Sequence, residues 1–153
     1  MLYRGQSISA IPNIQILVIP HGELDIVIKA KAILDYDDHD KLNPRPVPPT
    51  LTKARTGEKS EDYNDKKYVE QLDTWAKRRL AWITIKSLED SEIIWETIVL
   101  TDHTTWENYI PELKGAGFTP QEVGRILDLV GTVNSLDQKN IDDATSRFLA
   151  GQE

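Results

Sequence analysis

The sequence of 153 residues contains no cysteine, which excludes disulfides, thiolate metal sites and cysteine nucleophiles. It also has no apolar run near the ~20 residues that a membrane-spanning helix needs. The first residues lack the apolar stretch and small-residue cleavage site of a secretory signal. These absences favour a reducing compartment, and we predict a cytosolic protein.

Patterns that carry catalysis are scarce as well. The sequence has no Gly-rich phosphate-binding loop and no serine in a nucleophile elbow. The three histidines form no pair at a spacing of three or four residues, as a helical metal site would require: His21, His39 and His103. We therefore expect no catalytic residue, no cofactor and no metal, and predict that the protein is not an enzyme.

The acidic segment 35–40 is the one stretch that offers a competing interpretation. An EF-hand loop starting at Asp35 would need Gly at its sixth position and Glu at its twelfth, where this chain has Asp40 and Pro46. A solvated acidic turn is the simpler interpretation. A metal-dependent hydrolase stays as the alternative, with these residues as ligands: Asp35, Asp37, Asp38 and His39.

Acidic residues outnumber basic ones, with a formal net charge of −7, and they are concentrated in the second part of the chain. Residues 1–60 carry 8 Lys and Arg against 7 Asp and Glu, whereas residues 61–153 carry 10 against 18. Such an acidic surface repels phosphate backbones, so we expect no nucleic-acid partner. It weakly favours a basic protein partner, although a solvated acidic surface that aids solubility is the simpler interpretation.

The first part of the chain has the pattern of a β-hairpin. Alternating residues predict strands over 14–19 and 24–36, joined by a turn at 20–23 that contains Gly22. In the second strand the Lys29 and Lys31 side is expected to face water and the opposite side to be buried. A lone hairpin is only marginally stable, so it needs helices, further strands or a partner to pack against.

A proline-rich segment follows, with four prolines within Pro44–Pro49. Proline fixes φ and donates no backbone hydrogen bond, so we expect extended polyproline II conformation rather than sheet or helix. Residues 50–60 are polar and continue this segment. The chain is thus divided into a hairpin or small sheet at 1–43, an extended linker or arm at 44–60, and a helical part at 61–153.

The helical part is expected to hold about four helices. Residues 65–88 lack Gly and Pro and carry one apolar stripe at helical spacing: Tyr68, Leu72, Trp75, Ala76, Leu80 and Ile83. Thr104 and Glu107 predict a capping box for a helix ending near 114, and Thr119 and Glu122 predict another for a helix ending near 133. Asp137 is the expected cap of a last helix ending at Ala150, with an apolar face of Ile141, Ala144, Phe148 and Leu149. Residues 92–100 fit either a strand or a connection. The predicted class is therefore α+β: an N-terminal antiparallel hairpin or small sheet, an extended arm and a helical C-terminal part.

With no catalytic group identified, the candidate site is a binding surface on the arm and the long helix. A preordered extended segment loses little entropy on docking, and Trp and Arg are common anchors of protein interfaces. The candidate partner-binding residues are Pro44, Pro46, Pro48, Pro49, Trp75, Trp82, Arg78 and Arg79. Two simpler interpretations stay open: the tryptophans fill a small core, and the arm is only a spacer. The cluster 77–79 is read as a solvated helix face or a contact for an acidic partner rather than a nucleic-acid patch.

The order of these motifs carries a resemblance. The most specific parts are the arm NPRPVPPTLTKARTGE followed by the helix through KRRL, and the block GFTPQEVGRILDLVGTVNSLDQKNIDDATSRFL. In this order the chain resembles small tail assembly chaperones, or tail assembly proteins, of double-stranded DNA bacteriophages. The resemblance covers nearly the whole chain.

The resemblance implies a non-enzymatic viral protein made in the cytoplasm of the infected bacterium. Its implied partners are the tape-measure protein and the tail-tube protein, with homo-oligomers as a further form. The resemblance carries over no active-site residue. A structural tail or neck component retained in the virion is the alternative role that it leaves open.

Overall fold

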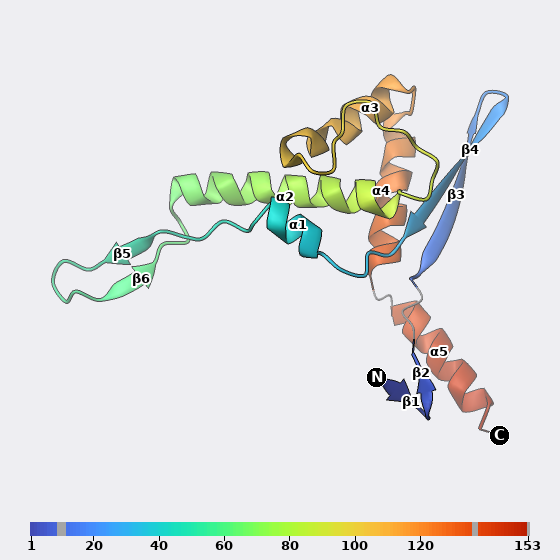
Figure 1. Cartoon of the computed structure of the whole chain (residues 1–153), viewed down its shortest axis with the longest axis horizontal. Coiled ribbons are helices and arrows are strands. Elements are labelled where there is room, and N and C mark those ends of the chain that lie inside the picture. The colour runs from blue at the N-terminus through green and yellow to red at the C-terminus, as the bar shows by residue number, and fades with distance from the viewer. Residues whose placement is uncertain (9–11, 136–137, 153) are drawn as a thin grey trace. The chain divides into compact units, whose positions relative to one another are not determined.

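The computed structural model describes residues 1–8, 12–135 and 138–152. It confirms the α+β class, with small antiparallel sheets and helices (Figure 1). The elements are β1 Leu2–Tyr3, β2 Gln6–Ser7, β3 Ile14–His21, β4 Leu24–Lys31, α1 Asp37–Leu42, β5 Thr50–Thr52, β6 Lys59–Glu61, α2 Lys66–Ser87, the 3-10 helix η1 His103–Asn108, α3 Tyr109–Gly115, α4 Pro120–Asn134 and α5 Gln138–Ala150. None of the helices within the described ranges is long and apolar enough to cross a membrane.

The chain forms two compact units, which we call the sheet unit and the helical unit. The sheet unit comprises Met1–Leu34, Lys86–Ile94 and Leu113–Glu153, and the helical unit comprises Asp35–Ile85 and Trp95–Glu112. This division differs from the predicted one, in which everything after residue 60 was one helical part. Within the sheet unit, α4 packs on the N-terminal strands β3 and β4.

The β3–β4 hairpin is the framework of the sheet unit. The two strands pair from Ile14↔Lys31 to His21↔Leu24, and the turn residue Gly22 has φ +64°, a conformation that glycine adopts without steric cost. One face of the hairpin packs against α4. Buried residues on the hairpin and α4 are Ile19, Ile28, Ala30, Val123, Ile126, Val130 and Val133. The prediction that the side opposite Lys29 and Lys31 is buried is confirmed.

Asn134, at the end of α4, ties this helix to the chain beyond β4. Its Oδ1 accepts a hydrogen bond from the Ile33 N–H at 2.8 Å, and its Nδ2 donates to Ser87 Oγ at 2.8 Å and to the Val130 carbonyl at 2.9 Å. One side chain therefore satisfies polar groups from three segments that are far apart in sequence.

The start of α4 confirms the predicted capping box. Thr119 Oγ1 accepts from the Glu122 N–H at 3.3 Å, and Glu122 Oε2 accepts from the Thr119 N–H at 2.7 Å. These two bonds satisfy backbone donors that have no partner within the helix. Pro120 occupies the first helical position, where its missing N–H costs nothing.

Thr119→Ala is expected to destabilise the protein by about 1 kcal/mol, the usual cost of losing an N-cap side chain. Urea unfolding followed by circular dichroism at the helix signal measures this change. Thr132→Ala, an exposed threonine near the end of the same helix, is the matched control and is expected to change stability by less than about 0.5 kcal/mol. Equal effects of the two substitutions would contradict the capping role of Thr119.

The helix α2 matches the predicted span 65–88 to within a residue at each end. Its predicted stripe is only partly buried, because Leu80 is half exposed and Ala76 is exposed. From residue 81 onward the helix is instead buried on several sides, at Ala81, Trp82, Thr84, Ile85 and Ser87. A single stripe is therefore a poor description of a helix whose last two turns lie inside the protein.

The segment after residue 100 begins differently from the prediction. Asp102 caps η1, with its carboxylate accepting from the Thr104 N–H at 3.0 Å, and Thr104 is not the N-cap. The helix over 104–114 is divided into η1 and α3, and residues 92–98 form neither helix nor strand. Asp102 and Thr104 are both residue types that cap helices, and they lie two residues apart. The spacing of Thr104 and Glu107 led to the prediction of Thr104 as the N-cap.

The arm at 44–60 is extended only in part. Residues 44–49 have no regular secondary structure, whereas β5 and β6 pair as a short antiparallel hairpin whose strand residues are all exposed (Figure 1). Gly57, with φ +68°, lies in the connection. Residues 44–49, where neither sheet nor helix was expected, form neither, and the polar continuation that was expected to be a linker or arm contains the β5–β6 hairpin.

The last helix, α5, has the bounds that were predicted. Its cap was expected at Asp137, which lies outside the described residues. The predicted apolar face is exposed along the described helix, including Phe148 and Leu149.

Candidate functional site

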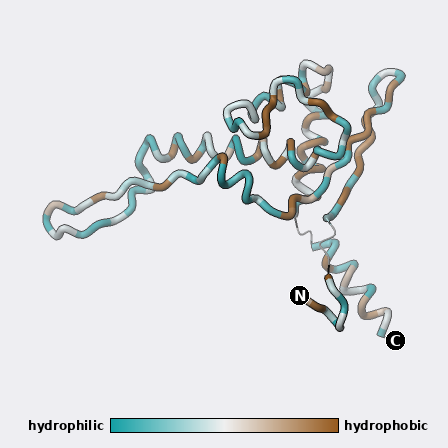
Figure 2. Tube along the Cα trace, in the orientation of Figure 1, coloured by the Kyte–Doolittle hydropathy of each residue, from teal (hydrophilic) through white to brown (hydrophobic). Residues whose placement is uncertain are grey.

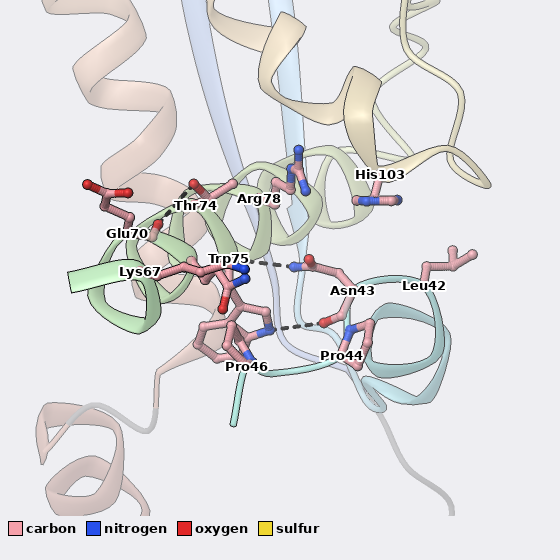
Figure 3. A pocket seen from close by; sticks show the side chains of 11 residues that line it. Leu42, Asn43, Pro44, Pro46, Lys67, Glu70, Thr74, Trp75, Arg78 and His103 are labelled. Atoms are coloured by element: carbon pink, nitrogen blue, oxygen red, sulfur yellow. Dashed lines mark hydrogen bonds between the residues drawn. The ribbon is translucent and has the colours of Figure 1, made fainter. Parts of the chain in front are cut away.

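A pocket of about 540 Å³ lies in the helical unit, beside the first three turns of α2. Its volume is within the range of about 300–1,000 Å³ that is typical of ligand sites. Its lining comes from the end of α1 and the segment after it, from α2 and from the start of η1: Leu42, Asn43, Pro44, Pro46, Lys67, Glu70, Gln71, Thr74, Trp75, Arg78 and His103 (Figure 3).

Two reciprocal hydrogen bonds hold the start of the proline arm against α2. Trp75 Nε1 donates to the Asn43 carbonyl at 2.9 Å, and Asn43 Nδ2 donates to the Trp75 carbonyl at 3.3 Å (Figure 3). Asn43 is buried, so these bonds are shielded from water. They fix Pro44 and Pro46 next to the Trp75 indole, and Arg45 Cζ lies 5.4 Å from the centroid of the Trp75 ring.

A buried histidine lies behind this wall of the pocket. His39 is 0% exposed and its ring lies 5.4–6.2 Å from the rings of Trp75, Trp82 and Trp106. Its Nδ1 lies 2.8 Å from Asp40 Oδ1, and its Nε2 lies 3.2 Å from Asn43 Nδ2. Asn43 Nδ2 can only donate, so a proton on Nδ1 would satisfy the contacts with Asn43 and Asp40. Arg79 NH1, which is also only a donor, lies 3.2 Å from the same Nδ1.

Asp40 is held in its charged form by its neighbours. The hydrogen bond from His39 and the positive charge of Arg79, whose NH1 lies 3.4 Å from Oδ1, lower the pKa of Asp40 below its ordinary value of 3.8. The unfolded chain therefore binds this proton more tightly than the folded protein does.

This shift predicts a loss of stability in acid. The contribution of the Asp40 carboxylate is present above its unfolded pKa and is lost as the pH falls through its lower folded pKa. Asp40→Asn is expected to make the decline of unfolding free energy below about pH 5 shallower than in the unchanged protein. Urea unfolding over a series of acidic pH values measures it. Parallel declines in the two proteins would contradict the assignment.

The pocket brings together four of the eight residues that the sequence singled out for partner binding: Pro44, Pro46, Trp75 and Arg78. Pro48 and Pro49 do not line it, and the Pro49 carbonyl accepts from the Asp62 N–H at 2.8 Å beside the β5–β6 hairpin. The arm therefore contributes only its first residues to the pocket, and not its whole length.

Two further candidates have structural roles. Trp82 is only 3% exposed, so its indole fills the interior and offers no surface to a partner. Arg79 Cζ lies 4.7 Å from the Tyr36 ring centroid, and its guanidinium contacts Asp40. Both residues contact the start of α1, and burial rules out Trp82 as a surface anchor, whereas the Arg79 side chain is 31% exposed.

The Arg78 side chain, on the wall of the pocket, has one buried nitrogen without a hydrogen bond to any described residue. Its Nε is buried and, within the part of the chain that the structure describes, has no hydrogen-bond partner. A buried donor without an acceptor costs about 1–3 kcal/mol. An acceptor from a bound molecule or from water would remove this cost.

Several lining residues were not found from the sequence. Lys67, Gln71 and Thr74 lie at steps of four, three and four along the series that ends at the candidate Arg78, so helical spacing could have placed them on one face with it. His103 gives no such signal, because it reaches the pocket from a segment 25 residues after Arg78 and only the fold brings it there.

The proposed metal ligands do not assemble. Among the described residues, no group of three or more His, Asp, Glu or Cys side chains is placed to hold a metal ion. The two ring nitrogens of His39 face Asp40 and Asn43 instead.

The comparisons with known proteins give no match. No protein-family model matches the chain, and no curated protein or solved structure is detectably similar to it.

Proposed function

We propose that the chain is a non-enzymatic adaptor that binds a segment of another protein in the pocket beside α2. The observation that supports this most directly is the buried Arg78 Nε without a hydrogen-bond partner, on the wall of a pocket that also presents Trp75 and Pro44. Tryptophan and arginine in a partly desolvated pocket are the residues that most often dominate protein interfaces.

The charges of the pocket favour an acidic residue in the bound segment. Lys67 and Arg78 contribute two cations against the single carboxylate of Glu70, in a protein whose net charge is −7. A carboxylate that accepts from Arg78 Nε would form a charge-assisted hydrogen bond, which is stronger than a neutral one. An apolar neighbour of that carboxylate would pack on Trp75 and the two prolines.

The resemblance of the sequence supports a setting for this adaptor. We propose that it acts as a tail assembly chaperone in the cytoplasm of a phage-infected bacterium, with the tape-measure protein or the tail-tube protein as its partner. A chaperone of a polymerising tail needs modest affinity at each site, so that many copies hold the client by avidity and can still be displaced. A single pocket of this size suits such an affinity.

Co-expression with the adjacent tape-measure and tail-tube proteins, followed by pull-down, tests this proposal. The proposal expects one of the two to be retained. If neither protein is retained, the proposed chaperone role is contradicted.

A structural tail or neck component is the second candidate. The observation that favours it is the exposed β5–β6 hairpin, since short strands with free edges can extend the sheet of a neighbouring subunit. Mass spectrometry of purified virions separates the two roles. A stoichiometric amount of the chain in virions supports the structural role, and its absence supports the chaperone.

A further inference from the structure

The face of the β3–β4 hairpin that does not pack on α4 is exposed, and its β3 row is apolar. Ile14, Ile16 and Val18 of β3 are 55%, 60% and 51% exposed, and Val27, which is paired with Val18, is 43% exposed. Figure 2 shows the hydrophobic colour along both strands. Natural sheets usually protect such a surface with charges, with proline or with a covering element.

The hydrogen bonds of Ser91 reveal which way the backbone groups of each strand point. Ser91 Oγ accepts from the Lys29 N–H at 2.7 Å and donates to the Lys29 carbonyl at 2.6 Å. Both Lys29 groups are thus directed away from β3. In an antiparallel pair the opposite residue must then direct its own groups outward, and that residue is Ile16.

As a result, within the described chain the outward backbone groups at the β3 edge of the hairpin are free, whereas two of the segments at the β4 edge have hydrogen-bond partners. On β4, Ser91 occupies the outward groups of Lys29, and Asn134 accepts from the Ile33 N–H just beyond the strand. On β3, the two-residue period directs the N–H and C=O of Ile14, Ile16 and Val18 outward together. No described residue forms a hydrogen bond with these outward groups.

The residues with free backbone groups are therefore the ones with exposed apolar side chains. We propose that β3 pairs antiparallel with β3 of a second copy of this chain, centred on Ile16. This inference is independent of the pocket and of the proposed function. In this register Ile16 faces Ile16 of the second copy, and Ile14 faces its Val18.

Self-pairing is favoured over a foreign strand because β3 complements itself. Its segment IQILVIP carries no charge, so no like charges oppose one another, and the pairs Ile16–Ile16 and Ile14–Val18 on the exposed face join β-branched residues. Pro20 donates no hydrogen bond and ends the ladder on one side. On β4, by contrast, the row on the exposed face includes Lys29 and Lys31.

Analytical ultracentrifugation of the full chain over a wide concentration range tests the pairing. A single strand edge is a small interface, so the dimer is expected in the micromolar to millimolar range. The weight-average mass should rise from 17.4 kDa toward twice that value. A mass of 17.4 kDa at every concentration would overturn the proposal. The free edge of β3 would then be available only to a strand of another protein.

Paired variants locate the interface. Ile16→Lys places two lysines opposite each other and should abolish the rise in mass, and an equal mixture of Ile16→Lys with Ile16→Glu should restore it. Val27→Lys makes the same change on the same face but away from the open edge, and should leave the dimer intact. If Val27→Lys abolishes the dimer to the same extent, the two copies pack face to face and edge pairing is overturned. A dimer that is unaffected by Ile16→Lys would also overturn edge pairing. Circular dichroism confirms that each variant is folded, and Arg78→Glu should dimerise normally whether or not the pocket binds a partner.

Discussion

Trp106→Ala is expected to lower the free energy of unfolding by about 3–5 kcal/mol, the usual cost of truncating a buried Trp or Phe. Trp106 is 0% exposed, and its ring lies 5.9 Å from that of the buried His39. Its Nε1 also donates to the Leu100 carbonyl at 3.2 Å. Because domains are stable by only about 5–15 kcal/mol, this loss would leave the helical unit barely folded.

Urea unfolding followed by tryptophan fluorescence measures this loss. All four tryptophans lie in the helical unit, so the signal reports that unit directly. Trp95→Ala is the matched control: the same side chain is removed from a partly exposed position, and the cost should be smaller. A cost below about 1 kcal/mol for Trp106→Ala would contradict the buried aromatic cluster around His39.

Arg78→Glu is expected to weaken partner binding by more than tenfold. The substitution removes the buried donor and places a carboxylate where the proposal expects the partner's own carboxylate. A hydrogen bond to a charged group is worth about 1.5–3 kcal/mol, and about 1.4 kcal/mol corresponds to tenfold in affinity. Isothermal titration with the purified tape-measure and tail-tube proteins measures the change.

Arg125→Glu is the control for this experiment. Arg125 is an exposed residue of α4 in the sheet unit, so the variant has the same net charge as Arg78→Glu and an unaltered pocket. Its affinity should match that of the unchanged protein. Equal weakening in both variants would indicate a general charge effect and would count against the pocket as the binding site.

Much of the fold could be predicted because several elements carry their signals locally. The 24-residue stretch without Gly or Pro gave α2, the reciprocal pair Thr119 and Glu122 gave the start of α4, and strict alternation gave the buried side of β4. In each case residues within one or two turns of each other determine the structure.

Elements that depend on distant contacts could not be predicted in this way. The helix α1 has only six residues, three of them aspartates, and reads as a solvated turn. It is held by His39, which is buried among tryptophans from α2 and η1. Nothing near residue 39 in the sequence indicates that burial, because tertiary packing overrides local preference.

The candidate site was predicted in outline and not in its boundaries. The proline arm and the long helix do meet at Trp75, but burial removes Trp82 from the surface and the Asp40 contact occupies Arg79. Exposure decides whether an aromatic or an arginine is an anchor. For a helix with several buried sides, periodicity alone does not determine exposure.

The most direct test of the pocket uses the natural absence of cysteine, since any introduced thiol is unique in the chain. Gln71→Cys lies in the pocket lining, whereas Gln121→Cys is exposed on α4. Each thiol is coupled to a photo-crosslinker and irradiated with the tape-measure or tail-tube protein. We predict a crosslinked product from position 71 with one of these proteins and little from position 121. Equal products from both positions, or a product from position 121 alone, would contradict binding in the pocket.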